Sequence, residues 1–328
     1  MSKQRILSGM RPTGKLHLGN YLGALENWVR LQNEYESFHM VADWHTLTTN
    51  YEDLTLLKQN TVDIVIDWLC AGLDPEKSPL FVQSHIKEHA ELHLIFSMLI
   101  TVARLERNPT VKEQVRDLGL ENRVSYGHFG YPVLQAADIL IYRAHAVPVG
   151  EDQLPHIEIT RELARRFNYV YKCELFPEPE PKLTSFGRLP GLDGKRMSKS
   201  MGNTINLADS PEEISKKVMQ AVTDPQKIRL HDPGRPEICT IFMYHTKFNP
   251  SEVTQIEADC RSGALGCVAC KKNLAAKLTL FLQPFREKRA YYEAHPNEVL
   301  DIISDGDRRA RNEAQATMQL VREAMNFG

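Results

Sequence analysis

Residues 5–20 read RILSGMRPTGKLHLGN, and this stretch indicates how the first half of the chain folds. Arg5 to Ser8 is a predicted strand, Gly9 to Gly14 a loop rich in glycine, and Leu18 to Gln32 a helix with a leucine stripe. A strand that turns into a helix N-terminus offers N–H groups and a positive dipole end to a phosphate. The stretch matches neither G-x-G-x-x-G nor a P-loop, so the two commonest nucleotide signatures are absent.

Strand-like runs alternate with helical patterns beyond this stretch, which favours an α/β domain with a parallel sheet. Further strands are expected at 38–42, 80–83 and 146–149, and helices at 57–69, 87–105, 133–142 and 153–167. Pro177, Pro179 and Pro181 are expected to break the chain, and beyond about residue 206 the pattern is mostly helical. We therefore predict a Rossmann-like catalytic domain over 1–205, followed by a helical domain over 206–328.

Composition sets few limits on function. The 328 residues carry a formal net charge of −2 and 42% hydrophobic residues, as in an ordinary globular protein. No apolar run approaches the roughly 20 residues that span a bilayer, and no signal peptide is evident, so we expect a cytoplasmic protein without a membrane partner. A local basic face can still bind RNA, because binding depends on where the charge sits.

A second segment, residues 194–203, reads GKRMSKSMGN and is cationic and bounded by glycines. Such a loop can move, and its charges can follow a departing pyrophosphate. Each segment alone has an ordinary explanation, a solvated loop here and a helix capped by Thr13 or His17 in the first. Together they are more specific. His17-Leu18-Gly19-Asn20 resembles the H-I-G-H signature of class I aminoacyl-tRNA synthetases, and Arg196 to Ser200 resembles their K-M-S-K-S loop.

This resemblance implies which residues act on ATP, which arrives with Mg²⁺. The expected catalytic residues are His17, Asn20, Lys195 and Lys199. The expected ATP-binding residues are Arg11, Thr13, Gly19, Asn20, Gly150, Asp152, Lys195, Met197, Ser198, Lys199 and Ser200. Asn20 replaces the usual second His and Arg196 the usual first Lys, but Asn still donates hydrogen bonds and Arg keeps the charge. Lys112 is a weaker candidate for stabilising pyrophosphate.

Tyr131, Gln135 and Asp138 are spaced i, i+4 and i+7, so they share one face of an otherwise apolar helix. A carboxylate among Ala, Ile and Leu needs a partner, because leaving it buried and unpaired is costly. The ordinary explanation is a structural ion pair or cap. The functional one is an acceptor for an indole N–H or a phenol O–H on a substrate.

These three residues resemble those with which the tryptophanyl and tyrosyl enzymes recognise the side chain of their amino acid. The likeness to the tryptophanyl type extends over nearly the whole chain. It implies an amino-acid pocket made of Leu7, His45, Tyr131, Gln135, Asp138 and Gln153. Asp138 would accept the indole N–H, while Tyr131 and Gln153 would hold the α-amino group. Gln135 departs from the Met of many bacterial tryptophanyl enzymes. Leu7, however, lacks the hydroxyl with which tyrosyl enzymes bind their substrate, so tryptophan is favoured over tyrosine.

The family likeness also implies the partners: tryptophan, ATP, a tRNA specific for tryptophan, and a second copy of the chain in a homodimer. Two other classes stay open. Another kind of nucleotidylyltransferase would lack the pocket around Asp138, and a non-catalytic paralogue would have lost His17 or Lys199.

Four of the six cysteines lie between residues 239 and 270: Cys239, Cys260, Cys267 and Cys270. In a reducing compartment, clustered thiols indicate a metal or cluster rather than disulfides. Thiolates suit either Zn²⁺ or a [4Fe-4S] cluster, and the spacing does not separate them. The arrangement resembles the [4Fe-4S] site in a subset of tryptophanyl enzymes, which favours iron–sulfur in a structural role. The adjacent Lys271 and Lys272 are candidates for contacts with RNA phosphates, and a solvated helix face is their ordinary explanation.

Overall fold

The computed structural model describes residues 3–117, 119, 124–183 and 189–327. The chain divides into two compact units. The first, here called the sheet unit, comprises Met1–Gly14, Glu26–Ser185 and His295–Gly328; the second, the helical unit, comprises Lys15–Leu25 and Phe186–Ala294. This division follows contacts within the chain. The predicted functional boundary near residue 205, with a catalytic part before it and a tRNA-binding part after it, stays a prediction.

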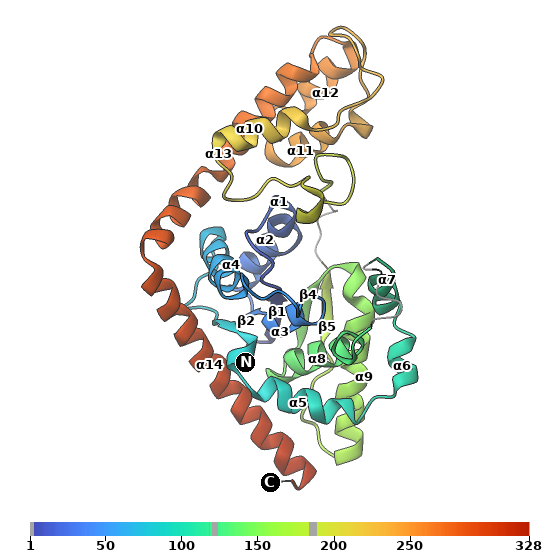
Figure 1. The fold of residues 1–328 in the computed structure, drawn as a ribbon, viewed down its shortest axis with the longest axis vertical. Helices are drawn as coiled ribbons and strands as arrows, with labels where there is room; N and C mark the ends of the chain where they lie inside the picture. The colour runs from blue at the N-terminus through green and yellow to red at the C-terminus, as the bar shows by residue number, and fades with distance from the viewer. Residues whose placement is uncertain (1–2, 118, 120–123, 184–188, 328) are drawn as a thin grey trace. The chain divides into compact units, whose positions relative to one another are not determined.

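The sheet unit is built on five parallel strands in the order β3-β2-β1-β4-β5 (Figure 1). Their bounds are β1 Arg5–Met10, β2 Glu36–Val41, β3 Leu80–Val82, β4 Ala146–Val149 and β5 Glu180–Leu183. The predicted parallel, Rossmann-like sheet is therefore confirmed. The strand order reverses between β1 and β4, because β1 pairs with β2 on one side and with β4 on the other. Open sheets of this kind bind ligands beyond the carboxyl ends of the strands at such a point.

Strand β5 corrects one expectation. The prolines from 177 to 181 were expected to interrupt the chain, yet Glu180–Leu183 pairs in register with β4, and Pro181 lies opposite Val147. Proline has no N–H to give to a ladder, and it is tolerated where only one side of a strand is paired. Strand β5 is at the edge of the sheet, so Pro181 can face the unpaired side.

Helices cover both faces of the sheet. The sheet unit contains α2 Glu26–Leu31, α3 Asp43–Leu47, α4 Leu57–Ala71, the 3₁₀ turn η2 Gln83–His85, α5 Glu88–Ser97, α6 Val102–Glu106, α7 Pro109–Asp117, α8 Tyr126–Ile141, the 3₁₀ turn η3 Glu151–Gln153, α9 Leu154–Tyr171 and α14 Pro296–Met325. Helices α5, α8, α9 and α14 join Leu7 and Phe38 in one large core. On the other face, Trp28 stacks on His39 at 5.2 Å between ring centroids, and its ring meets Trp68 edge-on.

Two predicted helices differ in extent from those observed. The helix expected over 87–105 is interrupted after α5, and Thr101 caps the start of α6 by accepting the N–H of Arg104. The helix expected over 133–142 begins earlier, because the Ser125 side chain caps α8 by accepting the N–H of His128. Tyr131, Gln135 and Asp138 all lie on α8, as predicted.

The helical unit holds both signature-like segments. It contains α1 Leu18–Asn20, the π-helical turn η1 Tyr21–Leu25, the 3₁₀ turn η4 Lys199–Met201, α10 Pro211–Gln220, the 3₁₀ turn η5 Pro236–Ile238, α11 Thr240–Phe248, α12 Val253–Ser262 and α13 Cys267–Ala294. The helix expected over 18–32 is therefore three segments, with a π-helical turn in the middle. Tyr21 of that turn packs edge-on against Phe281 of α13, with ring centroids 5.8 Å apart.

Within the described ranges, no helix has the length and apolar character needed to cross a membrane.

Candidate functional site

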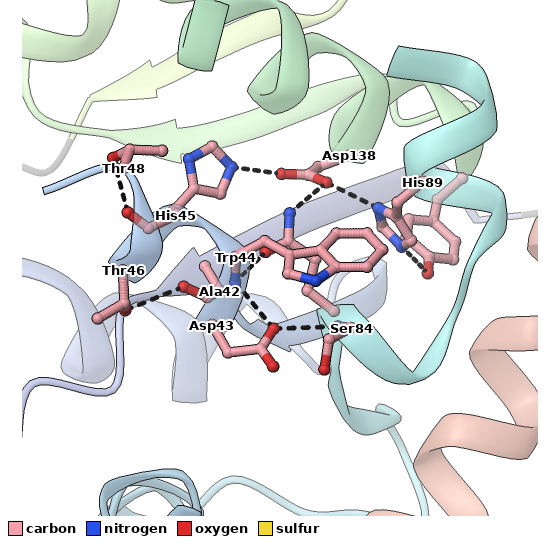
Figure 2. Close-up of polar contacts among 11 residues, drawn as sticks. Ala42, Asp43, Trp44, His45, Thr46, Thr48, Ser84, His89 and Asp138 are labelled. Carbon is pink, nitrogen blue, oxygen red and sulfur yellow. Dashed lines mark hydrogen bonds and ion pairs between the residues drawn. The ribbon is translucent and has the colours of Figure 1, made fainter. Parts of the chain in front are cut away.

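Asp138 lies at the centre of a buried hydrogen-bond network in the sheet unit (Figure 2). Its Oδ2 is 2.7 Å from Nε2 of His45, and its Oδ1 is 2.8 Å from Nε2 of Gln83 and 2.7 Å from Nδ1 of His89. Asp138 is only 1% exposed. Burial by itself raises the pKa of Asp138, but hydrogen bonds from His45 and His89 outweigh it and hold the pKa well below its ordinary value. The group is an ionised carboxylate and can only accept.

This ionisation fixes the protons around it. Because Asp138 cannot donate, Nε2 of His45 and Nδ1 of His89 must carry hydrogens. The other nitrogen of His89 then accepts from the Tyr142 hydroxyl, 2.8 Å away, and burial raises the pKa of that phenol so that it stays protonated. A carboxylate offers about four acceptor positions, and these contacts use three. Counting the described residues, one position remains, on Oδ2 beside His45, where a further N–H donor can bind.

Tyr131 is oriented by a second chain of hydrogen bonds. Its ring meets that of His45 edge-on at 6.3 Å. The side-chain oxygen of Asn108 accepts the N–H of Thr110, so the Asn108 amide donates to Nδ1 of His156 at 3.0 Å. The proton of His156 is therefore on Nε2, which donates to the Tyr131 oxygen at 2.7 Å. Burial lowers the pKa of His156 to about 4, so this ring stays neutral.

The remaining predicted pocket residues occupy the same unit. Leu7 is buried on β1 in the core that also contains Val133 of α8. Gln135 is half-buried on α8. Gln153 ends the turn η3 that follows β4, and its amide donates to Asp152 at 3.1 Å. The structure thus joins His45 and Asp138 directly and places Tyr131 against His45.

Four predicted ATP-binding residues of the sheet unit flank the point where the strand order reverses. Arg11 and Thr13 follow β1, while Gly150 and Asp152 follow β4. The Arg11 guanidinium donates to the Thr49 hydroxyl at 3.1 Å. A Cβ at Gly150 would lie 2.8 Å from Oδ1 of Asp152, so a larger residue there would displace that carboxylate.

His17 and Asn20 form a reciprocal cap at the start of α1. Nδ1 of His17 accepts the Asn20 N–H at 3.3 Å, and the Asn20 side-chain oxygen accepts the His17 N–H at 3.1 Å. The capping explanation is therefore correct, and it also orients both side chains. Since Nδ1 accepts, a neutral His17 carries its proton on Nε2, and Asn20 keeps its amide N–H₂ for donation. Burial first, and the charge of Lys199 second, lower the pKa of His17 to about 4.

The two signature-like segments lie together in the helical unit. A Cβ at Gly19 would be 3.0 Å from both the His17 ring and the sulfur of Met197. Lys199 begins the turn η4, close enough to His17 to lower its pKa, and the Lys195 side chain is exposed. The side chain of Ser200 lies outside the described residues.

Asn203 holds the lysine segment in shape, a role that the sequence analysis missed. Its side-chain oxygen accepts the Ser198 N–H at 2.8 Å, and its amide donates to Asp193 at 2.7 Å and to the Arg196 carbonyl at 3.0 Å. Gly191 makes room for it, since a Cβ there would lie 2.3 Å from the Asn203 amide nitrogen.

The four clustered cysteines come from neighbouring parts of the helical unit. Cys239 precedes α11, Cys260 lies on α12, and Cys267 and Cys270 lie in the first turn of α13. Burial raises the pKa of Cys270 to about 12, and the other three thiols add to the rise. The sulfur donors gather in one region and suit a thiophilic metal. Among the described residues, however, no three His, Cys, Asp or Glu side chains are arranged to hold a metal ion.

Lys271 does not have the role expected from the sequence. Its ammonium donates to the carbonyls of Met219 and Ala221, at 3.0 and 2.7 Å, and so caps the C-terminus of α10. Lys272 instead lines a hollow of about 420 Å³ beside Cys267, together with Lys227 and Arg229.

Known proteins resemble this chain over its whole length. The family described as class I tRNA synthetases (W and Y) matches residues 1–283. The tryptophan–tRNA ligase of Thermotoga maritima is 52% identical over 98% of this chain and 99% of its own length. That of Aquifex aeolicus is 46% identical over 98% of this chain and all of its own length. The crystal structure of tryptophanyl-tRNA synthetase from Campylobacter jejuni, complexed with ADP and tryptophan, gives a TM-score of 0.89 at 34% identity and covers 98% of this chain and 100% of that one.

Proposed function

The chain belongs to the class I tRNA synthetases for tryptophan and tyrosine, and on that premise we propose that it is a tryptophan–tRNA ligase. The carboxylate of tryptophan attacks the α-phosphorus of ATP and displaces pyrophosphate. A terminal hydroxyl of tRNA then attacks the carbonyl carbon of the resulting aminoacyl-adenylate, forming the aminoacyl ester and releasing AMP. Asp138, a buried ionised carboxylate with an acceptor position beside His45, can take an indole N–H or a phenol O–H. The observation that carries the choice of tryptophan is Leu7, which is buried on β1 and has no hydroxyl to offer a phenol. An indole N–H fits the position on Asp138, and a site built around such a donor rejects analogues that lack it.

The proposed activation step needs no protein nucleophile, because the substrate carboxylate attacks. Catalysis comes from positioning and from stabilising charge. In the helical unit, His17 donates from Nε2 and Asn20 from its amide to the phosphates of ATP, which arrives with Mg²⁺. Lys199 stabilises the departing pyrophosphate, with Lys195 exposed for the same task. The contacts proposed for Arg11, Thr13, Gly150 and Asp152 follow from their place at the strand ends.

We extend the proposal to the four cysteines and to RNA. The thiol cluster would bind a [4Fe-4S] centre, with Zn²⁺ as the alternative, and it would hold the N-terminus of α13 against α11 and α12. The four thiols come from neighbouring elements of the helical unit, which supports the idea. The exposed side chain of Lys272 would contact tRNA phosphates. A homodimer and a cytoplasmic location are further parts of the proposal.

The decisive experiment is amino-acid-dependent ATP–pyrophosphate exchange, run with each of the twenty amino acids on anaerobically purified protein. We expect exchange with tryptophan alone. Exchange with tyrosine instead would mean that Gln135, rather than Leu7 and Asp138, is the guide to specificity. No exchange with any amino acid would favour another nucleotidylyltransferase or a non-catalytic paralogue.

The same preparation tests the cysteine centre. About four iron and four sulfide per chain would support the cluster, and about one zinc would support the alternative. Cys267→Ser should lower the metal content, whereas Cys173→Ser, outside the cluster, should leave it unchanged. A metal-free protein with full exchange activity would contradict this part of the proposal.

A further inference from the structure

Four consecutive residues, Val82 to His85, connect helix α14 with the network around Asp138. They form the end of β3 and the turn η2. All the contacts lie within the sheet unit. The backbone of Val82 and the side chain of His85 contact α14, whereas Gln83 and the backbone of Ser84 contact the pocket side.

Asp307 is the α14 residue that holds this segment. Its Oδ1 accepts the Val82 N–H at 2.9 Å, and its Oδ2 is 2.5 Å from Nδ1 of His85. Asp307 is only 7% exposed. Burying a carboxylate is costly unless it is paired, so its contacts with Val82 and His85 are needed to stabilise it there. Arg311, one turn further along, donates to the His85 carbonyl at 3.1 Å.

The approach of α14 to β3 is unusually close. A Cβ at Gly306 would lie 2.0 Å from the Leu80 carbonyl oxygen, so this position admits only glycine at the observed separation. The Val82 N–H, on the edge strand β3, is satisfied by the Asp307 carboxylate in place of another strand. Helix α14 thus completes the edge of the sheet next to the site.

On the pocket side, Gln83 is fully buried and uses both ends of its amide. It donates to Oδ1 of Asp138 at 2.8 Å and accepts the Trp44 N–H at 3.1 Å. The next residue, Ser84, donates its N–H to Asp43 at 3.0 Å, and Figure 2 shows this contact at the start of α3. Since a buried amide bonded at both ends cannot rotate without losing a partner, the backbone of 82–84 fixes where the Gln83 donor points.

We propose that Asp307 is a positioning residue for recognition of the indole N–H, acting through Val82 and Gln83 on Asp138. Asp307 fixes the position of the Val82–His85 segment relative to α14. The segment sets the direction of the Gln83 amide, and that amide occupies Oδ1 of Asp138, which leaves Oδ2 for the substrate. This inference rests on the proposed function, because it takes tryptophan as the substrate.

The test compares Asp307→Ala with Asp307→Asn and with Glu313→Ala in tryptophan-dependent pyrophosphate exchange. Glu313 is a matched control, since it is also on α14 and pairs with Arg5 at 2.8 Å, away from Gln83. We expect Asp307→Ala to raise the KM for tryptophan about tenfold, with kcat and the KM for ATP changed less than about twofold. Asp307→Asn keeps an oxygen for the Val82 N–H and should restore most of the tryptophan KM.

A second readout separates positioning from a loss of stability. Discrimination between tryptophan and its benzothiophene analogue, in which sulfur replaces the indole N–H, should fall about tenfold in Asp307→Ala and stay unchanged in Glu313→Ala. An unchanged tryptophan KM and discrimination in Asp307→Ala, or equal shifts in both alanine variants, would overturn the inference. Absence of tryptophan exchange in the wild-type protein would instead overturn the proposed function.

Discussion

At the scale of single residues, the site depends on an ionised carboxylate held in a place where burial opposes ionisation. Asp138 stays charged because three donors surround it, and they come from different elements: His45 from α3, Gln83 from η2 and His89 from α5. Two of the donors are fixed by a further partner: the Tyr142 hydroxyl holds His89, and the Trp44 N–H holds Gln83. The number of donors therefore determines the one acceptor position that remains. A neutral side chain of the same shape cannot reproduce this arrangement.

Asp138→Asn tests that statement. An amide would direct N–H₂ toward at least one of the donors on His45, Gln83 and His89, leaving buried groups without acceptors. We expect kcat/KM for tryptophan to fall on the order of 100-fold in pyrophosphate exchange, equivalent to about 2.7 kcal/mol. Glu158→Gln, which removes a carboxylate from the surface of α9, should change kcat/KM less than about twofold. Asp138→Asn with kcat/KM within twofold of wild type would show that Asp138 is not the acceptor.

The sequence pattern predicted the residues that are regularly spaced along one helix, and the family resemblance added His45 from another element. Both missed Gln83, His89 and His156, which also meet the site across elements. Tyr131 and Asp138 were found because both lie on α8 at helical intervals. Gln83 and His156 carry no such local pattern, since their partners are 55 and 25 residues away. Their roles depend on where parallel strands place the loops that follow them, and that is a property of the sheet.

At the scale of secondary structure elements, the packing of α14 is another contact that its local sequence pattern does not predict. The amphipathic pattern of residues 296–325 predicts a helix, and the helix is present. The same pattern does not predict that this helix packs against β3. Gly306 is the residue in the α14 sequence that indicates this contact. In a helix interior, glycine costs about 1 kcal/mol relative to alanine, so its presence there needs a reason. The reason is the Leu80 carbonyl oxygen, 2.0 Å from where a Cβ would lie.

Gly306→Ala should therefore destabilise the protein although alanine is the better helix former. The added methyl group meets backbone rather than a flexible side chain, so α14 must move away from β3. We expect the free energy of unfolding to fall by about 2–3 kcal/mol in urea denaturation. The control is Ser304→Ala at an exposed position of the same helix, which should change stability by less than about 0.5 kcal/mol. A Gly306→Ala variant more stable than wild type would contradict the close approach.

At the scale of the whole molecule, buried neutral histidines make stability depend on pH. Burial lowers the pKa of His39 to about 3 and that of His156 to about 4, and burial with the charge of Lys199 lowers that of His17 to about 4. An unfolded histidine titrates near pH 6.5. Between that pH and about 4 the unfolded chain binds protons that the folded chain does not, so stability falls as the pH is lowered through this window.

His39 is the cleanest place to measure this effect, because it is fully buried against Trp28 and lies on the sheet face away from Asp138. As the pH is lowered from 7 to 5, each such histidine should reduce the free energy of unfolding by about 2 kcal/mol. His39→Leu should therefore lose about 2 kcal/mol less than wild type over that interval, whatever its stability at pH 7. Ser37→Ala, on the same face of β2, changes packing but keeps the histidine, and it should follow the wild-type pH dependence. Denaturant unfolding at the two pH values measures all three proteins. Equal losses in His39→Leu and wild type would mean that His39 takes up its proton without unfolding. Burial opposes this, because neither ring nitrogen has a hydrogen-bond partner among the residues that the structure describes.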